Sequence, residues 1–206
     1  GLDSLENLGK AAKTVSRRLA SSSGGRRNLA IQKIATALID SEQKIMSENS
    51  KDISNGRNKG LSEAMLDRLV ITKESIHGMS SDALKVANLD DPVGEMIEMK
   101  TMENGLQVGR KRVPLGVIGV IYESRPNVTV DISVLCLKSG NAVILRGGSE
   151  AFYSNQILAK VIRDAVSKAD LPKDSIQIVQ STDRKLVSEM LNLDQYIDLM
   201  IPRGGQ

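Results

Sequence analysis

The sequence is poor in aromatic residues, histidine and cysteine. Its 206 residues include one phenylalanine, three tyrosines, no tryptophan, one histidine and one cysteine. With so few aromatic rings, the stacking platforms that bind single-stranded nucleic acid are not expected. The single Cys136 excludes an internal disulfide, and the single His77, without a carboxylate cluster at ligand spacing, indicates no metal site. The same scarcity argues against a Ser-His-Asp hydrolase.

A strong excess of one charge and long apolar runs are also missing. The net charge is +3, from 28 basic and 25 acidic residues. This mild excess favours small anionic ligands and does not by itself indicate nucleic acid. No stretch has the length or the flanking residues of a signal peptide or a membrane span. We therefore expect a cytoplasmic protein that binds neither membranes nor nucleic acid.

The first 91 residues predict a helical segment, and residues 92–113 predict a β-hairpin. In the first segment, apolar residues recur at spacings of three and four between polar breaks. In the second, two extended runs flank an Asn-Gly turn, which is a typical hairpin signal. The expected helices cover 5–19, 29–39, 45–55, 62–69 and 72–87, and the expected hairpin strands cover 96–102 and 106–113.

From residue 114 onward, short apolar runs alternate with helical patterns. Helix-length connections between buried strands favour right-handed crossovers and a parallel sheet. Residues 114–206 therefore predict a Rossmann-like, doubly wound layer, and the fold class is α/β with a helical N-terminal segment. The expected strands cover 115–122, 142–145, 176–179 and 197–201, and the helices between them cover 127–138, 150–168 and 183–191.

Arginine and glycine follow the expected strands, where ligands of such sheets bind. Gly147 and Gly148 would let backbone N–H groups approach a phosphate, because neither has a side chain. Ser149 and Glu150 then begin a helix whose positive end favours an anion, and Arg146 adds a full positive charge. The end of the chain repeats this Arg-Gly-Gly arrangement. The predicted cofactor-binding residues are Arg146, Gly147, Gly148, Ser149, Glu150, Arg203, Gly204 and Gly205.

The position of Arg146 also indicates which cofactor binds. In the usual dinucleotide fold, an acidic residue at the end of the second strand bonds the adenosine ribose and would repel a 2′-phosphate. An arginine at this place favours NADPH over NADH. The usual G-x-G-x-x-G sequence after the first strand is missing, because Gly116 and Gly119 lie within the strand. We therefore expect the nucleotide to bind in a non-standard way.

Several blocks of the sequence resemble the γ-glutamyl phosphate reductase family of the aldehyde dehydrogenase superfamily. They are "NKGLSEAMLDRLVIT", "NLDDPVGE", "RVPLGVIGVIYESRPNVTVDISVLCLKSGNAVILRGGSEA" and "LVSEMLNLDQYIDLMIPRGG", and the resemblance extends along essentially the whole chain. It implies a Rossmann-like cofactor domain without the glycine fingerprint. It also implies NADPH-dependent reduction of L-glutamyl 5-phosphate to the semialdehyde in proline biosynthesis, through thiolate attack, phosphate release and hydride transfer. The hairpin is then a candidate oligomerisation element of a homo-oligomer, and glutamate 5-kinase is a candidate partner.

The resemblance also implies roles for individual residues. The loop after the first strand of the sheet would supply Asn127 as the donor to the acyl oxygen, and Arg125 would anchor the anionic substrate. The alternative for these residues is a plain helix start. The family's nucleophilic cysteine lies downstream of "IPRGG", in a catalytic domain that this sequence does not contain. Cys136 lies in an apolar helix, where we expect it to be a buried small hydrophobe.

Alternatives remain open for both the function and the sites. The chain is expected to be the cofactor-binding half of the reductase and to be inactive alone. It could instead be the reductase portion of a bifunctional pyrroline-5-carboxylate synthase, although no kinase segment precedes Gly1, or a non-catalytic nucleotide-binding or assembly module. The segment 146–150 could be a surface turn with a helix cap, and 203–205 a frayed terminus.

Overall fold

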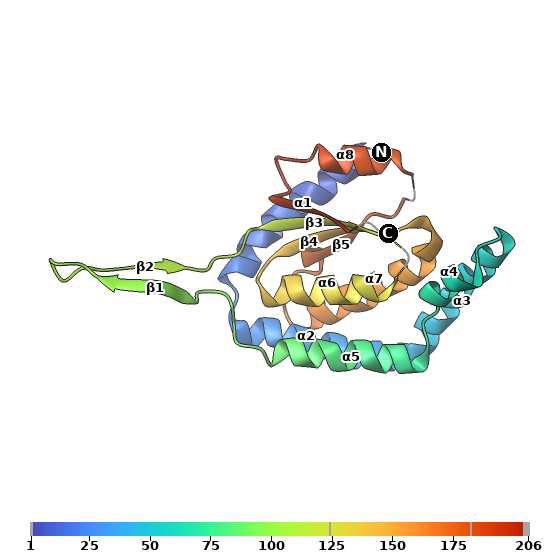
Figure 1. Ribbon diagram of the computed structural model, residues 1–206, viewed down its shortest axis with the longest axis horizontal. Coiled ribbons are helices and arrows are strands. Elements are labelled where there is room, and N and C mark those ends of the chain that lie inside the picture. Colours follow the sequence, from blue (N-terminus) through green and yellow to red (C-terminus); the bar gives the residue numbers. More distant parts are fainter. Residues whose placement is uncertain (1, 124, 182, 204–206) are drawn as a thin grey trace.

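The computed structural model describes residues 2–123, 125–181 and 183–203 (Figure 1). Helices fill its first part, as the periodicity predicts, and three of them begin with a side-chain cap. The hydroxyls of Ser23, Ser62 and Thr72 accept hydrogen bonds from backbone N–H groups three residues later, which satisfies donors that a helix start leaves free. The helices are α1 (Leu2–Ser21), α2 (Gly24–Asp40), α3 (Glu42–Asn58), α4 (Glu63–Leu69) and α5 (Lys73–Ala87).

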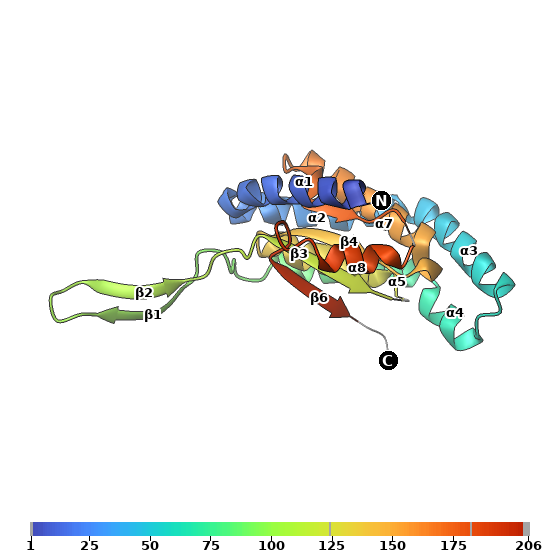
Figure 2. The ribbon, with the colours of Figure 1, turned by 90° about the horizontal axis from the view of Figure 1, so that it is seen from above.

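The predicted hairpin is confirmed and projects from one end of the molecule, opposite α3 and α4 (Figure 2). Strand β1 (Met96–Thr101) pairs antiparallel with β2 (Gln107–Lys111). Gly105 in the connecting turn has φ +84°, a conformation that glycine adopts without strain. At the base of the hairpin, the buried Arg27 donates from Nη2 to both carboxylate oxygens of Asp91, at 2.8 and 2.9 Å.

A four-stranded parallel sheet forms the rest of the fold and confirms the α/β prediction. Its strands lie in the order β5-β4-β3-β6, and the connecting helices make it doubly wound. The strands are β3 (Val117–Tyr122), β4 (Ala142–Arg146), β5 (Ile176–Ile178) and β6 (Leu199–Arg203). The helices are α6 (Asn127–Lys138), α7 (Phe152–Lys168) and α8 (Lys185–Leu191), with short 3₁₀ helices η1 (Ser149–Ala151) and η2 (Lys173–Ser175).

The last strand begins two residues later than predicted. Ile197 is apolar and buried, which is why the sequence pattern includes it in a strand. Its backbone N–H instead donates to the carbonyl of Leu193 at 3.0 Å and closes a turn. The carboxylate of Asp198 then accepts from the backbone N–H of Val117 at 2.8 Å. The backbone N–H of Asp198 donates in turn to the carbonyl of Val117 at 2.8 Å, so a side-chain bond and a backbone bond together join the start of β6 to β3.

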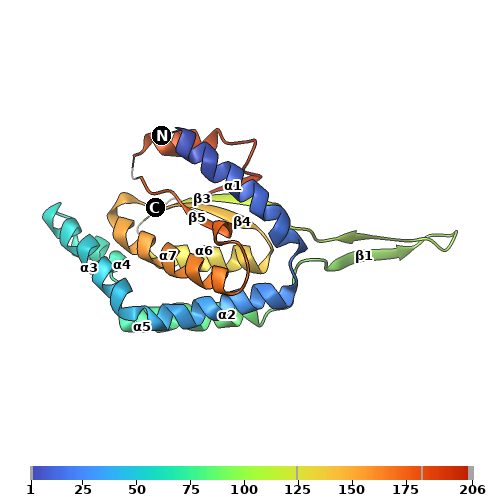
Figure 3. The ribbon, with the colours of Figure 1, turned by 180° about the vertical axis from the view of Figure 1, so that it is seen from behind.

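The elements stack in layers around one hydrophobic core. Helices α1 and α8 cover one face of the sheet, α6 and α7 cover the other, and α2 and α5 form a further layer outside α6 and α7 (Figures 1 and 3). The buried core runs from α2, with Ile31 and Leu38, to the strands, with Val120 and Ile144. Leucine, isoleucine, valine and alanine build most of it. Among the described residues, no helix is both long and apolar enough to cross a membrane.

Candidate functional site

The carboxyl ends of three strands meet at one edge of the sheet. In the register, Ile121 of β3 pairs with Arg146 of β4, and Tyr122 pairs with Arg203 of β6. From β3 the chain proceeds to β4 and then β5 in one direction across the sheet. It then crosses back to β6, on the opposite side of β3, so the winding direction reverses between β3 and β6. Such a switch point is where ligands of open α/β sheets bind. The structure therefore brings the ends of these predicted segments together, while Gly204 and Gly205 lie outside the described residues.

The loop from β3 to α6 presents polar side chains at this edge. Arg125 and Asn127 are both exposed, and α6 begins at Asn127. Within the described residues, no side chain caps this helix. The first turn is closed by backbone bonds, from Val128 to the carbonyl of Arg125 and from Thr129 to that of Pro126. An uncapped N-terminus is electrostatically suited to an anion or to a developing oxyanion.

A buried polar network holds this loop in place. The hydroxyls of Tyr122 and Thr129 lie 2.5 Å apart, and the Thr129 hydroxyl donates to Oδ1 of Asn155 at 3.0 Å. Since a threonine hydroxyl has one proton, Tyr122 must be the donor in the first contact. Burial raises the pKa of Tyr122 well above its ordinary value, which keeps that proton in place. The network joins the end of β3 to α6 and α7.

These three residues were not predicted from the sequence. The available signal was Tyr122, because the hydroxyl of a tyrosine at the end of a buried strand needs a partner. Thr129 and Asn155 lie in helices and are almost fully buried, at 0% and 3% exposure. Their burial could not be deduced from helical periodicity, which treats polar residues as solvent-facing.

The two glycines after β4 have a structural reason beside the predicted one. A Cβ atom at Gly147 would overlap the side-chain amide of Asn155, and one at Gly148 would overlap the carboxylate of Glu150. Gly147 therefore leaves room for the buried network. The approach of the backbone to a phosphate, and the cofactor-binding roles of Arg146, Gly147, Gly148, Ser149 and Glu150, stay predictions.

The helix after β4 begins differently from the prediction. Residues Ser149–Ala151 form a 3₁₀ turn, and the α-helix starts at Phe152 instead of Glu150. The carboxylate of Asp52, from α3, accepts from the backbone N–H groups of Tyr153 and Ser154 at 3.2 and 2.7 Å. These donors are therefore already satisfied, and an anion would have to use those of the preceding turn. Burial raises the pKa of Asp52, although the bonds from Ser154 and Tyr153 oppose this shift.

Arg146 itself is buried, with 7% of the residue exposed, and it occupies the last position of β4. The sequence analysis expected a cation facing a ligand beyond the strand. In the structure, most of the residue is instead buried. For Arg203 only the backbone is described, paired with Tyr122.

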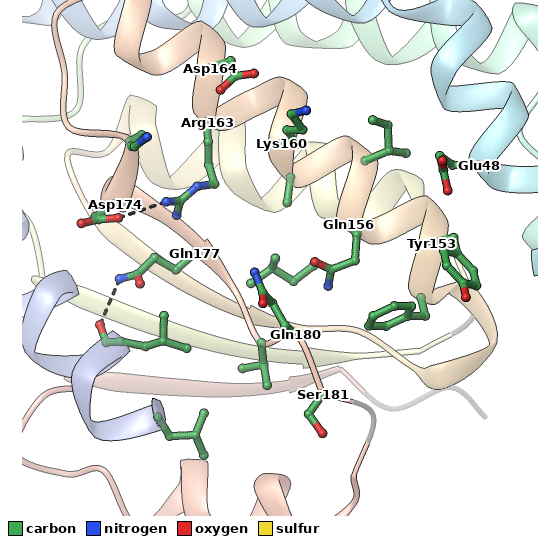
Figure 4. A pocket seen from close by; sticks show the side chains of 18 of the residues that line it. Glu48, Tyr153, Gln156, Lys160, Arg163, Asp164, Asp174, Gln177, Gln180 and Ser181 are labelled. Carbon is green, nitrogen blue, oxygen red and sulfur yellow. Dashed lines mark hydrogen bonds and ion pairs between the residues drawn. The ribbon is translucent and has the colours of Figure 1, made fainter. Parts of the chain in front are cut away.

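A groove of about 960 Å³ follows the outer edge of β5, between α7 on one side and α1 and α8 on the other (Figure 4). Near the start of β5, Arg163 donates to the carbonyl of Ile176 at 2.6 Å and to Asp174 at 3.1 Å, which covers that part of the edge. Near the end of β5 the groove is lined by Gln180, and by Tyr153 from α7. Its volume is in the range of small-molecule sites. The sequence analysis did not identify this groove, because it is formed by segments far apart in the chain.

Cys136 is buried, as predicted, with 5% exposure. Burial raises the pKa of its thiol to about 12. A nucleophilic cysteine needs accessible thiolate at neutral pH, so Cys136 is unsuited to that role. Within the described residues, no group of three or more histidine, cysteine or acidic side chains is arranged to hold a metal ion.

The sequence matches the aldehyde dehydrogenase family over residues 3–201. The chain belongs to this family. A γ-glutamyl phosphate reductase of Vibrio vulnificus is 53% identical over 201 residues, which cover 98% of this chain and 48% of the relative. The crystal structure of the γ-glutamyl phosphate reductase of Thermotoga maritima superposes with a TM-score of 0.95 at 41% identity, over 98% of this chain and 49% of that one.

These comparisons confirm the resemblance drawn from the sequence blocks. They also show that the chain spans about half the length of the curated relatives that it matches. A more distant structure, an engineered glycolyl-CoA reductase with bound NADP⁺, has the same fold at 17% identity, with a TM-score of 0.69 over 96% of this chain.

Proposed function

We propose that this chain is the cofactor-binding half of an enzyme that reduces L-glutamyl 5-phosphate to L-glutamate 5-semialdehyde with NADPH, releasing phosphate in proline biosynthesis. The observation that carries the proposal is the 53% identity to a γ-glutamyl phosphate reductase over nearly the whole chain. The buried thiol of Cys136 leaves the nucleophile to be supplied from outside these residues. By itself the chain is expected to be inactive.

In this proposal the loop from β3 to α6 acts on the acyl group. The amide of Asn127 donates to the acyl oxygen as negative charge develops there, and the N-terminal end of α6 favours the same charge. Arg125 attracts the anionic substrate. The support is the exposure of both side chains at the switch point of the sheet.

The cofactor is assigned to the segment 146–150 together with the end of β6. Support comes from the basic residue at the end of the second strand of the sheet, and from the bound NADP⁺ of the glycolyl-CoA reductase that shares the fold. When bound, the cofactor supplies hydride. The residues of this chain contribute binding and orientation.

Cofactor preference tests this proposal in the enzyme that contains this chain. NADPH should support turnover better than NADH, and Arg146→Ala should lower the affinity for NADPH on the order of tenfold to a hundredfold, as expected for the loss of a charge-assisted contact. Lys168→Ala, which removes a positive charge at the C-terminal end of α7, is the control and should leave the NADPH affinity unchanged. An unchanged preference in Arg146→Ala would remove Arg146 from the cofactor site, and absence of reduction with either cofactor would refute the function.

We also propose that the hairpin joins copies of the enzyme in a homo-oligomer. A two-stranded ribbon is at best marginally stable alone. In this one, Met96, Met99 and Val108 each expose about half of their surface, which a neighbouring copy could cover. Light scattering of Met99→Lys should show a smaller species than the wild type, whereas Met65→Lys, an exposed methionine on α4, should not. An unchanged mass would exclude the hairpin as the interface. Glutamate 5-kinase, which would supply the acyl phosphate, stays a candidate partner.

A further inference from the structure

A second cavity, of about 170 Å³, lies between α4, α5 and the start of α6. Its walls carry charges of both signs together with the amide of Asn127. Arg68 contributes from α4, Asp82 from α5 and Asp131 from α6. The cavity is separate from the groove along β5, with which it shares no lining residue. Its mixed charges fit a small zwitterion better than a simple anion.

The spacing along α6 relates this cavity to the reacting group. Asn127 and Asp131 are four residues apart in one helix, so their Cβ atoms lie on the same face, about 5–6 Å apart. In L-glutamyl 5-phosphate, four single bonds separate the acyl carbon from the α-amino nitrogen, and at about 1.5 Å each they span roughly 5 Å when extended. A substrate whose acyl oxygen meets Asn127 can therefore place its α-ammonium group at Asp131.

The opposite wall can hold the α-carboxylate. Arg68 is exposed, and within residues 2–123, 125–181 and 183–203 its guanidinium has no hydrogen-bond or ion-pair partner. A guanidinium binds a carboxylate through two parallel hydrogen bonds. Asp82 pairs with Lys85 at 3.8 Å on the exposed surface of α5, which is a weak contact. Ile71 and Met79 form an apolar, buried part of the wall that can contact the methylene groups.

We propose that this cavity recognises the α-amino acid head of the substrate. Asp131 binds the ammonium group, with Asp82 beside it, and Arg68 binds the α-carboxylate. The proposal rests on the proposed function and deepens it, because it names the residues that distinguish an amino acid from an unsubstituted acid of the same length. Asp131 is then a specificity-determining residue.

The test uses the enzyme that contains this chain, run in the oxidative direction with NADP⁺ and phosphate. Two aldehydes are compared: L-glutamate 5-semialdehyde, and 5-oxopentanoate, which has the same length and carboxylate but no amino group. Asp131→Asn should lower kcat/KM for the first on the order of tenfold to a hundredfold, as for the loss of a charge-assisted hydrogen bond. For the second, kcat/KM should change by less than about twofold. Each variant is compared with the wild type on the same substrate.

Two further variants make the result specific. Arg68→Ala should raise KM for both aldehydes, since both carry the carboxylate. Asp67→Asn makes the same chemical change as Asp131→Asn, at the residue before Arg68. It should leave kcat/KM for both aldehydes unchanged, because Asp67 does not line the cavity. Unaltered NADP⁺ affinity in each variant shows that the fold is intact.

The outcomes separate this inference from the proposed function. A wild-type enzyme that oxidises neither aldehyde refutes the function, and the inference with it. If the wild type is active but Asp131→Asn lowers kcat/KM by the same factor for both aldehydes, the proposed function stands and the inference is overturned. Equal wild-type kcat/KM for the two aldehydes would also overturn it.

Discussion

Replacing Thr129 with valine removes the hydroxyl at the centre of the buried network while keeping the shape of the side chain. Thr129 is fully buried, and its hydroxyl contacts Tyr122 at 2.5 Å and Asn155 at 3.0 Å. Valine leaves the Tyr122 hydroxyl and the Asn155 carbonyl without this partner. Each unsatisfied buried polar group costs about 1–3 kcal/mol, so for the two groups the free energy of unfolding should fall by roughly 2–6 kcal/mol.

Equilibrium unfolding in urea measures this loss, and Thr36→Val provides the matched control. Thr36 also lies in a helix, but it is exposed, and its hydroxyl donates to the carbonyl of Gln32 at 3.3 Å. The control should change the free energy of unfolding by no more than about 0.5 kcal/mol. Helix propensity is nearly equal for threonine and valine, so it cancels in the comparison.

A double-mutant cycle isolates the contact itself. Tyr122→Phe removes the donor, and once Thr129 has lost its hydroxyl, this second change also removes an unpaired group. The double variant should therefore be more stable than the sum of the single effects predicts, by about 1 kcal/mol. If Thr129→Val destabilises no more than Thr36→Val, or if the two effects add, the network does not hold the loop as argued.

Three further predictions concern single residues. Asn127→Ala in the enzyme that contains this chain should lower kcat roughly a hundred- to a thousandfold with little change in NADPH affinity, measured by steady-state kinetics; a near-normal kcat would reduce Asn127 to a helix start. Cys136→Ala should keep full turnover, and iodoacetamide should modify Cys136 only slowly in the folded protein, since burial raises the pKa of its thiol to about 12. Burial would raise the pKa of Asp198, but bonds from Val117 and Lys13 outweigh it and lower the pKa. Ionised Asp198 therefore stabilises the fold above pH 3.8, and this contribution is lost as pH falls through the lowered value. Asp198→Asn should cost about 1 kcal/mol at neutral pH and progressively less in acid, as measured by urea unfolding.

The sequence was sufficient to predict the class of fold and the place of the site along the chain. Buried strands and helices differ in apolar period, and the carboxyl ends of parallel strands necessarily share one edge. The ends of helices and strands were predicted less accurately where a side chain from a distant part of the sequence determines them. The start of α7 depends on Asp52, and the sequence separation between Asp52 and Ser154 is 102 residues. The substrate cavity likewise combines Arg68 with Asp131, and no local pattern brings these two together.

Helix α6 is fixed at both ends, and this determines the geometry of the candidate site. At its start, Thr129 is held by the buried network. At its end, the buried ammonium group of Lys138 donates to the side-chain oxygen of Asn28 and to the carbonyls of Ala87 and Leu89, at 2.9, 2.9 and 2.6 Å. A buried ammonium is stable only when such acceptors replace water, so this contact has a defined position.

The same reasoning extends from α6 to the N-terminal helices. Lys138 ties α6 to α2 and to the end of α5, which carries Asp82 on the opposite wall of the cavity. Asp52 of α3 fixes the start of α7, which in turn supplies Asn155 to the network around Thr129. The first helices therefore do more than cover the sheet. They fix the distance between Asp131 and the wall that faces it, and a cavity that selects by the length of its ligand requires that distance to be constant.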